Sequence, residues 1–270
     1  MPEYLPHVLT IAGSDSGGGA GIQADLKTVT ALGCYGTSAV TALTAQNTTG
    51  VKGVHPAPPE FVKLQIETVA EDIRLDACKT GMLANRAIVE AVVESLADLT
   101  TQNLVVDPVL RAQSGDPLLE REAEATVRNE LLPLARIVTP NLPEAAALGG
   151  IDVSTPEEMK EAAEQLAGQG PDWALVKGGH LAGEPVDVLS DGAETLRISR
   201  PRVDTRNTHG TGCTYSSAIA ARLAQGLSVP RAVEVARDDL QRGLEHALSI
   251  GSGRGPLGPP AMFRMSRDRP

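Results

Sequence analysis

The chain has 270 residues, of which 41% are hydrophobic, enough for one large α/β domain or two small ones. A net charge of −10 and only 2% aromatic residues argue against a partner made of nucleic acid or anionic membrane. The three cysteines, Cys34, Cys78 and Cys213, form no CxxC pair, so we expect neither a disulfide framework nor a zinc site. With no signal-peptide pattern and no long apolar window, the sequence predicts a cytoplasmic protein.

Strand-like and helix-like stretches alternate through most of the chain, with glycine or proline at several boundaries. The pattern changes only near Asp191-Gly192, a turn signal between two short strands. In chain order we predict strand Val8–Ile11, helix Ile22–Leu32, strand Ser38–Leu43, helix Pro59–Ala70, strand Asp76–Thr80, helix Ile88–Leu96, strands Leu104–Val106 and Arg136–Thr139, helix Pro156–Leu166, strand Trp173–Val176, a hairpin within Pro185–Arg200, and helices Thr214–Ala224 and Arg231–Leu248.

This alternation predicts a single three-layer α/β/α domain over residues 1–257, with a mostly parallel central sheet and helices on both faces. The Gly/Pro/Arg-rich residues from Gly251 onward, and residues 258–270 in particular, are expected to form a flexible tail. Ligands of such sheets bind beyond the carboxyl ends of the strands. Asp107, Asn141, Lys177 and the glycine-rich loop from Gly13 all lie at such ends.

The run from Asn207 to Thr214 places two glycines and a cysteine at the start of a predicted helix. Unpaired N–H groups and the positive end of the helix dipole would attract a phosphate there, and glycine allows it close approach. The same dipole is expected to lower the pKa of Cys213. A glycine-rich turn that caps a core helix is the simpler alternative. Neither GxxxxGK[ST] nor GxGxxG is present, so a nucleotide would be held by another architecture.

Several blocks in order resemble the ribokinase superfamily, and within it the hydroxymethylpyrimidine/phosphomethylpyrimidine kinases of thiamin biosynthesis. The resemblance covers roughly residues 8–257, in the blocks 10–27, 41–48, 79–83, 107–109, 139–145, 177–180 and 208–214. It implies a ribokinase-like fold and transfer of the γ-phosphoryl group of ATP to 4-amino-5-hydroxymethyl-2-methylpyrimidine, then to the resulting monophosphate. It also suggests a homodimer.

The resemblance implies that Gln46, Asp25, Gly13 and Met82 lie on the substrate side. The amide of Gln46 suits an aminopyrimidine edge, and Met82 would form a soft apolar wall. Each has a structural alternative: a surface glutamine, a first-turn helix acid, a tight-turn glycine and a core methionine.

On the nucleotide side, Asn141 and Glu144 resemble the NxxE element that organises Mg²⁺ near the phosphates, and Asp107 could join its outer shell. Lys177 and Thr208 resemble phosphate contacts. An ordinary helix acid, a solvated lysine and a helix cap are the alternatives.

Cys213 stands where the wider superfamily usually has a catalytic aspartate, which favours the pyrimidine branch. We expect Cys213 to activate or orient the substrate hydroxyl, while the N–H groups of Gly210, Thr211, Gly212 and Cys213 stabilise the transferring charge. A buried cysteine at a helix start is the alternative.

Three competing functions are a pyridoxal or pyridoxine kinase of the same branch, a sugar kinase, and a binding protein without catalysis. The Gln46 block and Met82 favour the pyrimidine, Cys213 disfavours the sugar, and the phosphate cradle disfavours a pure binder. A lid is expected at the Arg111–Asp116 loop or the Pro185–Arg200 hairpin.

Overall fold

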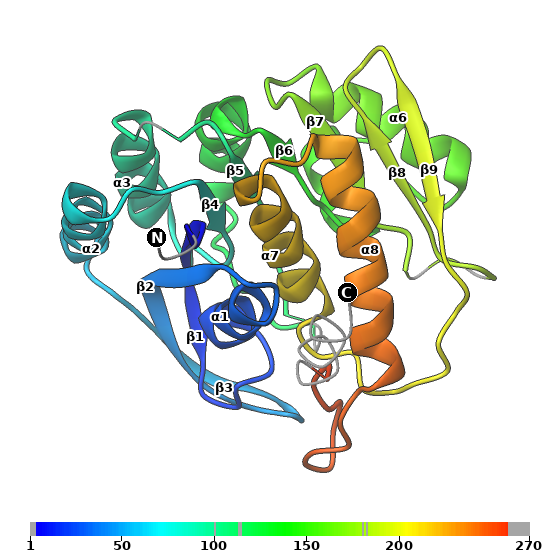
Figure 1. Cartoon of the computed structure of the whole chain (residues 1–270), viewed down its shortest axis with the longest axis horizontal. Helices are drawn as coiled ribbons and strands as arrows, with labels where there is room; N and C mark the ends of the chain where they lie inside the picture. Colours follow the sequence, from blue (N-terminus) through cyan, green and yellow to red (C-terminus); the bar gives the residue numbers. More distant parts are fainter. Residues whose placement is uncertain (1–3, 100, 113–114, 180, 182, 259–270) are drawn as a thin grey trace.

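A nine-stranded sheet in the order β3-β2-β1-β4-β5-β6-β7-β8-β9 runs through the computed structural model (Figure 1). The structure describes residues 4–99, 101–112, 115–179, 181 and 183–258. Neighbours from β2 to β7 pair in parallel, whereas the pairs β2–β3, β7–β8 and β8–β9 are antiparallel. The predicted mostly parallel sheet is therefore confirmed. The strands are β1 (His7–Asp15), β2 (Tyr35–Asn47), β3 (Gly50–Pro56), β4 (Ala77–Thr80), β5 (Leu104–Val106), β6 (Ile137–Val138), β7 (Trp173–Val176), β8 (Val186–Ser190) and β9 (Thr195–Ser199).

Helices cover both faces of the sheet. Those nearest the viewer in Figure 1 are α1 (Gly21–Ala31), α7 (Thr211–Ala224) and α8 (Val229–Glu245), which pack side by side on one face. The other face is covered by α2 (Pro59–Asp72), α3 (Arg86–Ala97), α4 (Ala123–Thr126) with its π and 3-10 continuations (Val127–Leu131, Leu132–Leu134), α5 (Leu142–Gly149) and α6 (Pro156–Ala167).

Each face of the sheet has its own hydrophobic core. Leu9 and Ile11 of β1 point into the core beneath α2 and α3, and Val8 points into the core beneath α1 and α7. This alternation follows from the period of two in a strand, so an uninterrupted apolar strand implies helices on both sides. The three-layer prediction is therefore confirmed.

The sequence analysis missed β3, α4 and α5. The strand β3 is mostly exposed and contains glycine, lysine and histidine, so it lacks an apolar alternation. Only eight residues form α5, which begins inside the block interpreted as a metal-binding element. The predicted hairpin is confirmed: β8 pairs with β9 across a turn in which Asp191 accepts hydrogen bonds from the N–H groups of Ala193 and Glu194.

The glycine-rich segment 251–258 is packed against the domain, which corrects the expectation of a tail that is flexible from Gly251 onward. The N–H of Arg254 donates to the carbonyl of Thr48 at 3.0 Å, and Leu257 is buried among residues of α7 and α8. Backbone hydrogen bonds and one apolar anchor therefore hold this segment. Residues 259–270 of the expected tail lie outside the described residues.

Candidate active site

The side chains that follow three neighbouring parallel strands meet at one edge of the sheet. Asp107 follows β5, Asn141 follows β6 and Lys177 follows β7. The Nζ atom of Lys177 lies 2.9 Å from Oδ1 of Asp107, and a backbone bridge joins Asn141 to Lys177. The structure thus brings together three residues that are far apart in the sequence.

The first turn of α7 faces this cluster. Gly210 is the N-cap, with a φ of 80°, and the first intrahelical bond runs from the N–H of Thr214 to the carbonyl of Gly210. The N–H groups of Gly212 and Cys213 therefore have no acceptor within the helix. A Cβ on Gly212 would lie 3.4 Å from Nζ of Lys177, so these N–H groups and the ammonium form one cradle for an anion.

The charged groups of the cluster shift one another's pKa values. Burial disfavours the ionised carboxyl of Asp107, but Lys177 and Lys79 lower its pKa below the usual value. Burial raises the pKa of Glu144 to about 7, although Lys177 opposes this shift and Asp107 adds to it. Burial would lower the pKa of Lys177, yet Asp107 and Glu144 raise it, so the lysine carries its positive charge at neutral pH.

Asn141 and Glu144 form a capping box at the start of α5. The Asn141 side chain accepts from the N–H of Glu144, and the Glu144 carboxylate accepts from the N–H of Asn141, both at 2.9 Å. The alternative of a helix-terminal acid is therefore confirmed. The capping box also holds the Glu144 carboxyl where it interacts electrostatically with Lys177 and Asp107. No cluster of three metal-binding side chains occurs within the described part of the chain.

The substrate-side residues lie at the ends of β1, β2 and β4. A Cβ on Gly13 would lie 2.9 Å from Sδ of Met82. Gly13 lies inside β1, at a register shift between Ala12 and Ser14, so the tight-turn alternative is wrong. Met82 is buried in the core, and Oε1 of the half-buried Gln46 accepts from Oγ1 of Thr44 at 3.2 Å.

Asp25 is a buried residue of α1, and its burial does not fit the expected direct contact with substrate. Its side chain is 0% exposed and pairs with the equally buried Lys79 at 2.9 Å. Thr10 and Ser217 also donate to its carboxylate, at 2.6 and 2.7 Å. The first-turn alternative is wrong as well, because the first turn of α1 contains no acid. Sequence reasoning assigned no role to Lys79. A lysine within a fully buried strand such as β4 needs a partner of opposite charge, and this requirement could have pointed to Asp25.

The expected lowering of the Cys213 pKa is wrong. Burial raises the pKa of this thiol to about 11, with the Lys79 ammonium acting in the opposite direction and Asp25 and Asp107 adding to the increase. Desolvation of the thiolate thus outweighs the positive end of α7, although Cys213 lies in the first turn of that helix. Thr211, one position beyond the N-cap, uses its hydroxyl and its N–H on the carbonyl of Thr208.

Sequence reasoning also missed the pair Asp15 and His209. Asp15 accepts from the N–H groups of Gly17, Gly19 and Ala20 at 2.8–3.0 Å, so the first glycine-rich loop surrounds a carboxylate of its own chain. Nε2 of His209 lies 2.8 Å from the same carboxylate. An acid followed by a run of glycines is the signal that could have identified this arrangement.

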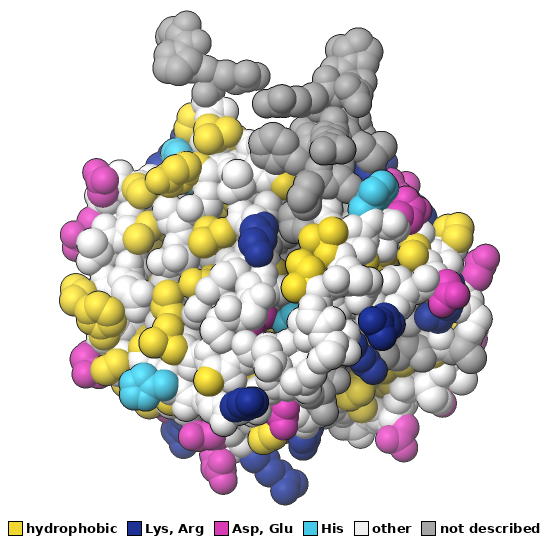
Figure 2. Space-filling view, turned by 90° about the horizontal axis from the view of Figure 1, so that it is seen from below, with side chains coloured by type: hydrophobic (Ala, Val, Ile, Leu, Met, Phe, Trp, Pro, Cys, Tyr) yellow, Lys and Arg dark blue, Asp and Glu magenta, His cyan; other side chains and the backbone are white. Residues whose placement is uncertain are grey.

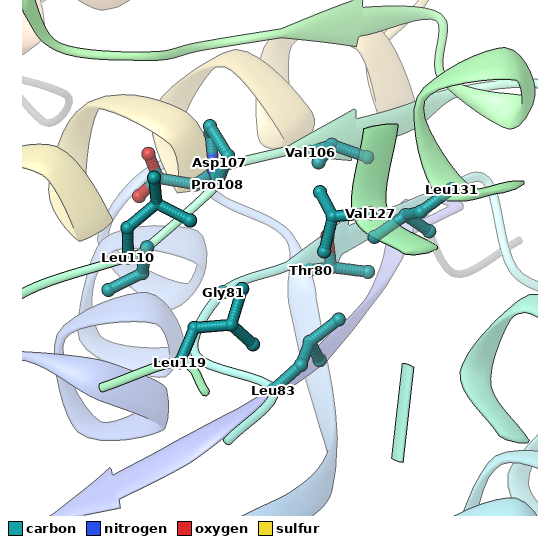
Figure 3. A pocket seen from close by; sticks show the side chains of 11 residues that line it. Thr80, Gly81, Leu83, Val106, Asp107, Pro108, Leu110, Leu119, Val127 and Leu131 are labelled. Carbon is teal, nitrogen blue, oxygen red and sulfur yellow. The ribbon is translucent and has the colours of Figure 1, made fainter. Parts of the chain in front are cut away.

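A small cavity of about 10 Å³ lies beside Asp107, between β4, β5 and the α4 region (Figure 3). Leucine and valine side chains line most of it, together with Thr80, whose hydroxyl has no hydrogen-bond partner among the described residues. The nearby lid expected at Arg111–Asp116 includes residues 113–114, which are outside the described residues, so the identity of the lid stays a prediction.

The fold and this site together define a kinase of the ribokinase-like class. The model of the phosphomethylpyrimidine kinase family matches residues 15–258. Hydroxymethylpyrimidine/phosphomethylpyrimidine kinase of Streptomyces coelicolor is 50% identical over 95% of both chains. This chain therefore belongs to the phosphomethylpyrimidine kinase family and is a phosphotransferase of thiamin biosynthesis.

Solved structures of kinases share this fold. The phosphomethylpyrimidine kinase of Clostridium difficile is 44% identical, with a TM-score of 0.78 over 87% of this chain and 98% of that one. The pyridoxal kinase of Staphylococcus aureus in complex with ADP is 34% identical, with a TM-score of 0.91 over 97% and 96%. No helix within the described residues has the length and apolar character needed to cross a membrane.

Proposed function

We propose that this protein phosphorylates 4-amino-5-hydroxymethyl-2-methylpyrimidine twice, with residues 1–257 acting as one kinase domain. In the first round the hydroxymethyl oxygen attacks the γ-phosphorus of ATP, the bond to the β-phosphate oxygen breaks, and ADP leaves. In the second round a phosphate oxygen of the monophosphate attacks in the same way. The anion cradle of α7 and Lys177 is the observation that carries this proposal.

Phosphoryl transfer has a loose transition state, so positioning and charge neutralisation dominate its catalysis. The N–H groups of Gly212 and Cys213 and the ammonium of Lys177 surround the transferring group, and Thr208 and Asn141 border the nucleotide phosphates. The N–H of Thr211, expected to join them, donates instead to the carbonyl of Thr208. With its pKa raised to about 11, Cys213 is a thiol at neutral pH. It therefore orients the substrate hydroxyl in preference to acting as a strong base.

Mg²⁺ fits the donor chemistry of the site. Asp107 and Glu144 present carboxylate oxygens, the ligands that Mg²⁺ prefers, and each of them interacts electrostatically with Lys177. With two acids and no third ligand among the described residues, these carboxylates would hold the ion mainly through water and ATP oxygens. When bound, Mg²⁺ neutralises charge on the phosphates.

The flat ring lies between Gly13 and Gln46, with Met82 as an apolar wall behind Gly13. Gln46 offers a donor and an acceptor to an aminopyrimidine edge. Pyridoxal phosphorylation is the secondary candidate, because solved pyridoxal kinases match nearly the whole chain.

A product assay by mass spectrometry tests the function. The protein would receive Mg·ATP with the pyrimidine and, separately, with pyridoxal. Successive gain of one and two phosphoryl groups on the pyrimidine is expected, and phosphorylation of pyridoxal alone would move the assignment to the vitamin B6 kinases. Cys213→Ala is expected to reduce turnover, and near-full turnover would remove Cys213 from the mechanism.

A cytoplasmic homodimer is the assembly we propose. The free thiols of Cys34, Cys78 and Cys213 suit a reducing compartment. Exposed apolar side chains on β2, β3 and α2 would be covered by a second copy: Leu43, Val54, Phe61 and Leu64. Hydrophobic side chains also gather on the left of the face in Figure 2. Light scattering of the purified protein tests the dimer.

A further inference from the structure

His209 lies where three segments of the chain meet. Its ring is 14% exposed and contacts Asp15 of the first glycine-rich loop. The backbone N–H of His209 donates to the carbonyl of Gly255, in the C-terminal segment, at 3.1 Å. The residue after it, Gly210, is the N-cap of α7, so His209 directly precedes the anion cradle.

The contact between the two loops is too close for side chains. A Cβ on Gly19 would lie 2.3 Å from Cδ2 of His209, and a Cβ on Gly210 would lie 1.9 Å from the carbonyl oxygen of Gly19. The glycines therefore let the imidazole and the N-cap lie directly on the backbone of the first loop. The position of α7 depends on this contact as well as on its hydrophobic packing.

The ionisation state of Asp15 determines which residue donates in the Asp15–His209 hydrogen bond. Burial would raise the pKa of Asp15, but the bonds from His209, Ala20 and Gly17 lower it, so Asp15 is a carboxylate and can only accept. His209 therefore donates from Nε2. A residue that donates from the same place should substitute for it.

We propose that His209 is a positioning residue: by donating to Asp15 it fixes the first turn of α7 against the first loop and aims the N–H groups of Gly212 and Cys213 at the transferring phosphoryl group. The inference rests on the proposed kinase function. Displacing the cradle by about 1 Å would lower kcat far more than the affinity for the ring, because the cradle acts on the transferring group. The residues that border the ring, Gln46 of β2 and Gly13 of β1, are held by the pairing of these strands within the sheet.

The test replaces His209 by two amide side chains of different length. The side-chain nitrogen of His209→Gln reaches the place of Nε2, whereas that of His209→Asn reaches only the place of Nδ1. We expect kcat within about 3-fold of wild type for His209→Gln, and a loss of about 100-fold for His209→Asn and His209→Ala, with KM for the pyrimidine changed by less than about 3-fold. Asp15→Asn combined with His209→Ala should be no worse than the poorer single variant.

Equal kcat for the Gln and Asn variants, or an Ala variant within 3-fold of wild type, would overturn the proposal. Thermal unfolding of each variant identifies any that fail to fold, and if His209→Ala is among them the Gln–Asn comparison decides. Wild-type protein that transfers no phosphoryl group would refute the proposed function instead, so the two failures are distinguishable.

Discussion

Two glycine-rich loops of this protein look alike in sequence and use their backbone in opposite ways. In the loop that follows Ser14, the N–H groups of Gly17, Gly19 and Ala20 all donate to the carboxylate of Asp15. At the start of α7, the N–H groups of Gly212 and Cys213 have no acceptor in the helix, and a Cβ on Gly212 would lie 3.4 Å from Nζ of Lys177. The first loop binds an anion of its own chain, whereas the second is available to an external one.

The difference follows from what precedes the glycines. An acid two residues before Gly17 supplies an internal acceptor, while His209 before Gly210 supplies a donor. A glycine run therefore indicates close backbone approach, and the residue before it indicates whether the N–H groups remain available to a ligand.

The largest effect is expected for Gly210→Ala, with a loss of kcat/KM of about 10³-fold, because the cradle would be displaced. The added Cβ would overlap the carbonyl of Gly19 at 1.9 Å, and the φ of 80° is itself strained for alanine. Steady-state kinetics measures the loss, and circular dichroism checks the fold.

Gly226→Ala is the matched control for Gly210→Ala. Its φ is 86°, but nothing lies within 4 Å of the added Cβ, so it measures backbone strain alone. Equal kinetics for the two variants would show that the contact between the loops has no role in catalysis.

Lys177→Met should lower kcat/KM for Mg·ATP by about 100-fold, since a charge within the cradle is lost. The comparison variant is Lys27→Met, because the ammonium of Lys27 donates to the carbonyl of Gly18 in the first loop at 2.7 Å. A loss of less than about 3-fold is expected there. If both lysine variants lost activity equally, the functional contrast between the loops would fail.

Asp15→Asn tests the first loop through stability. The folded-state pKa of Asp15 is below its ordinary value, so the ionised carboxyl contributes stability above pH 3.8, and this contribution is lost as the pH falls through the folded pKa. Urea unfolding at pH 7 should show a decrease of about 1–3 kcal/mol, which shrinks only below about pH 4. Asp191→Asn, in the exposed hairpin turn, is the control with a smaller effect.

The sheet and most helices were predictable because apolar strands alternate with amphipathic helices. The convergence of Asp107, Asn141 and Lys177 was also predictable, because parallel strands end at one edge. The burial of Asp25 against Lys79 and the Asp15–His209 pair were not. Each joins residues more than 50 positions apart, and no local pattern encodes such a pairing.

The smallest expected effect concerns the alkylation rate of Cys213. The sequence predicts a lowered pKa for this thiol, whereas the structure gives a raised one. With a pKa of about 11, only about one thiol in 10³ is ionised at pH 8, so labelling by iodoacetamide should be slow and rise tenfold per pH unit up to pH 9.5. Peptide mass spectrometry assigns the label, and Cys34 and Cys78 serve as internal controls because both are buried. A labelling rate that levels off below pH 8 would show that the pKa of Cys213 is lowered after all. The dipole of α7 would then affect this thiol more strongly than desolvation does.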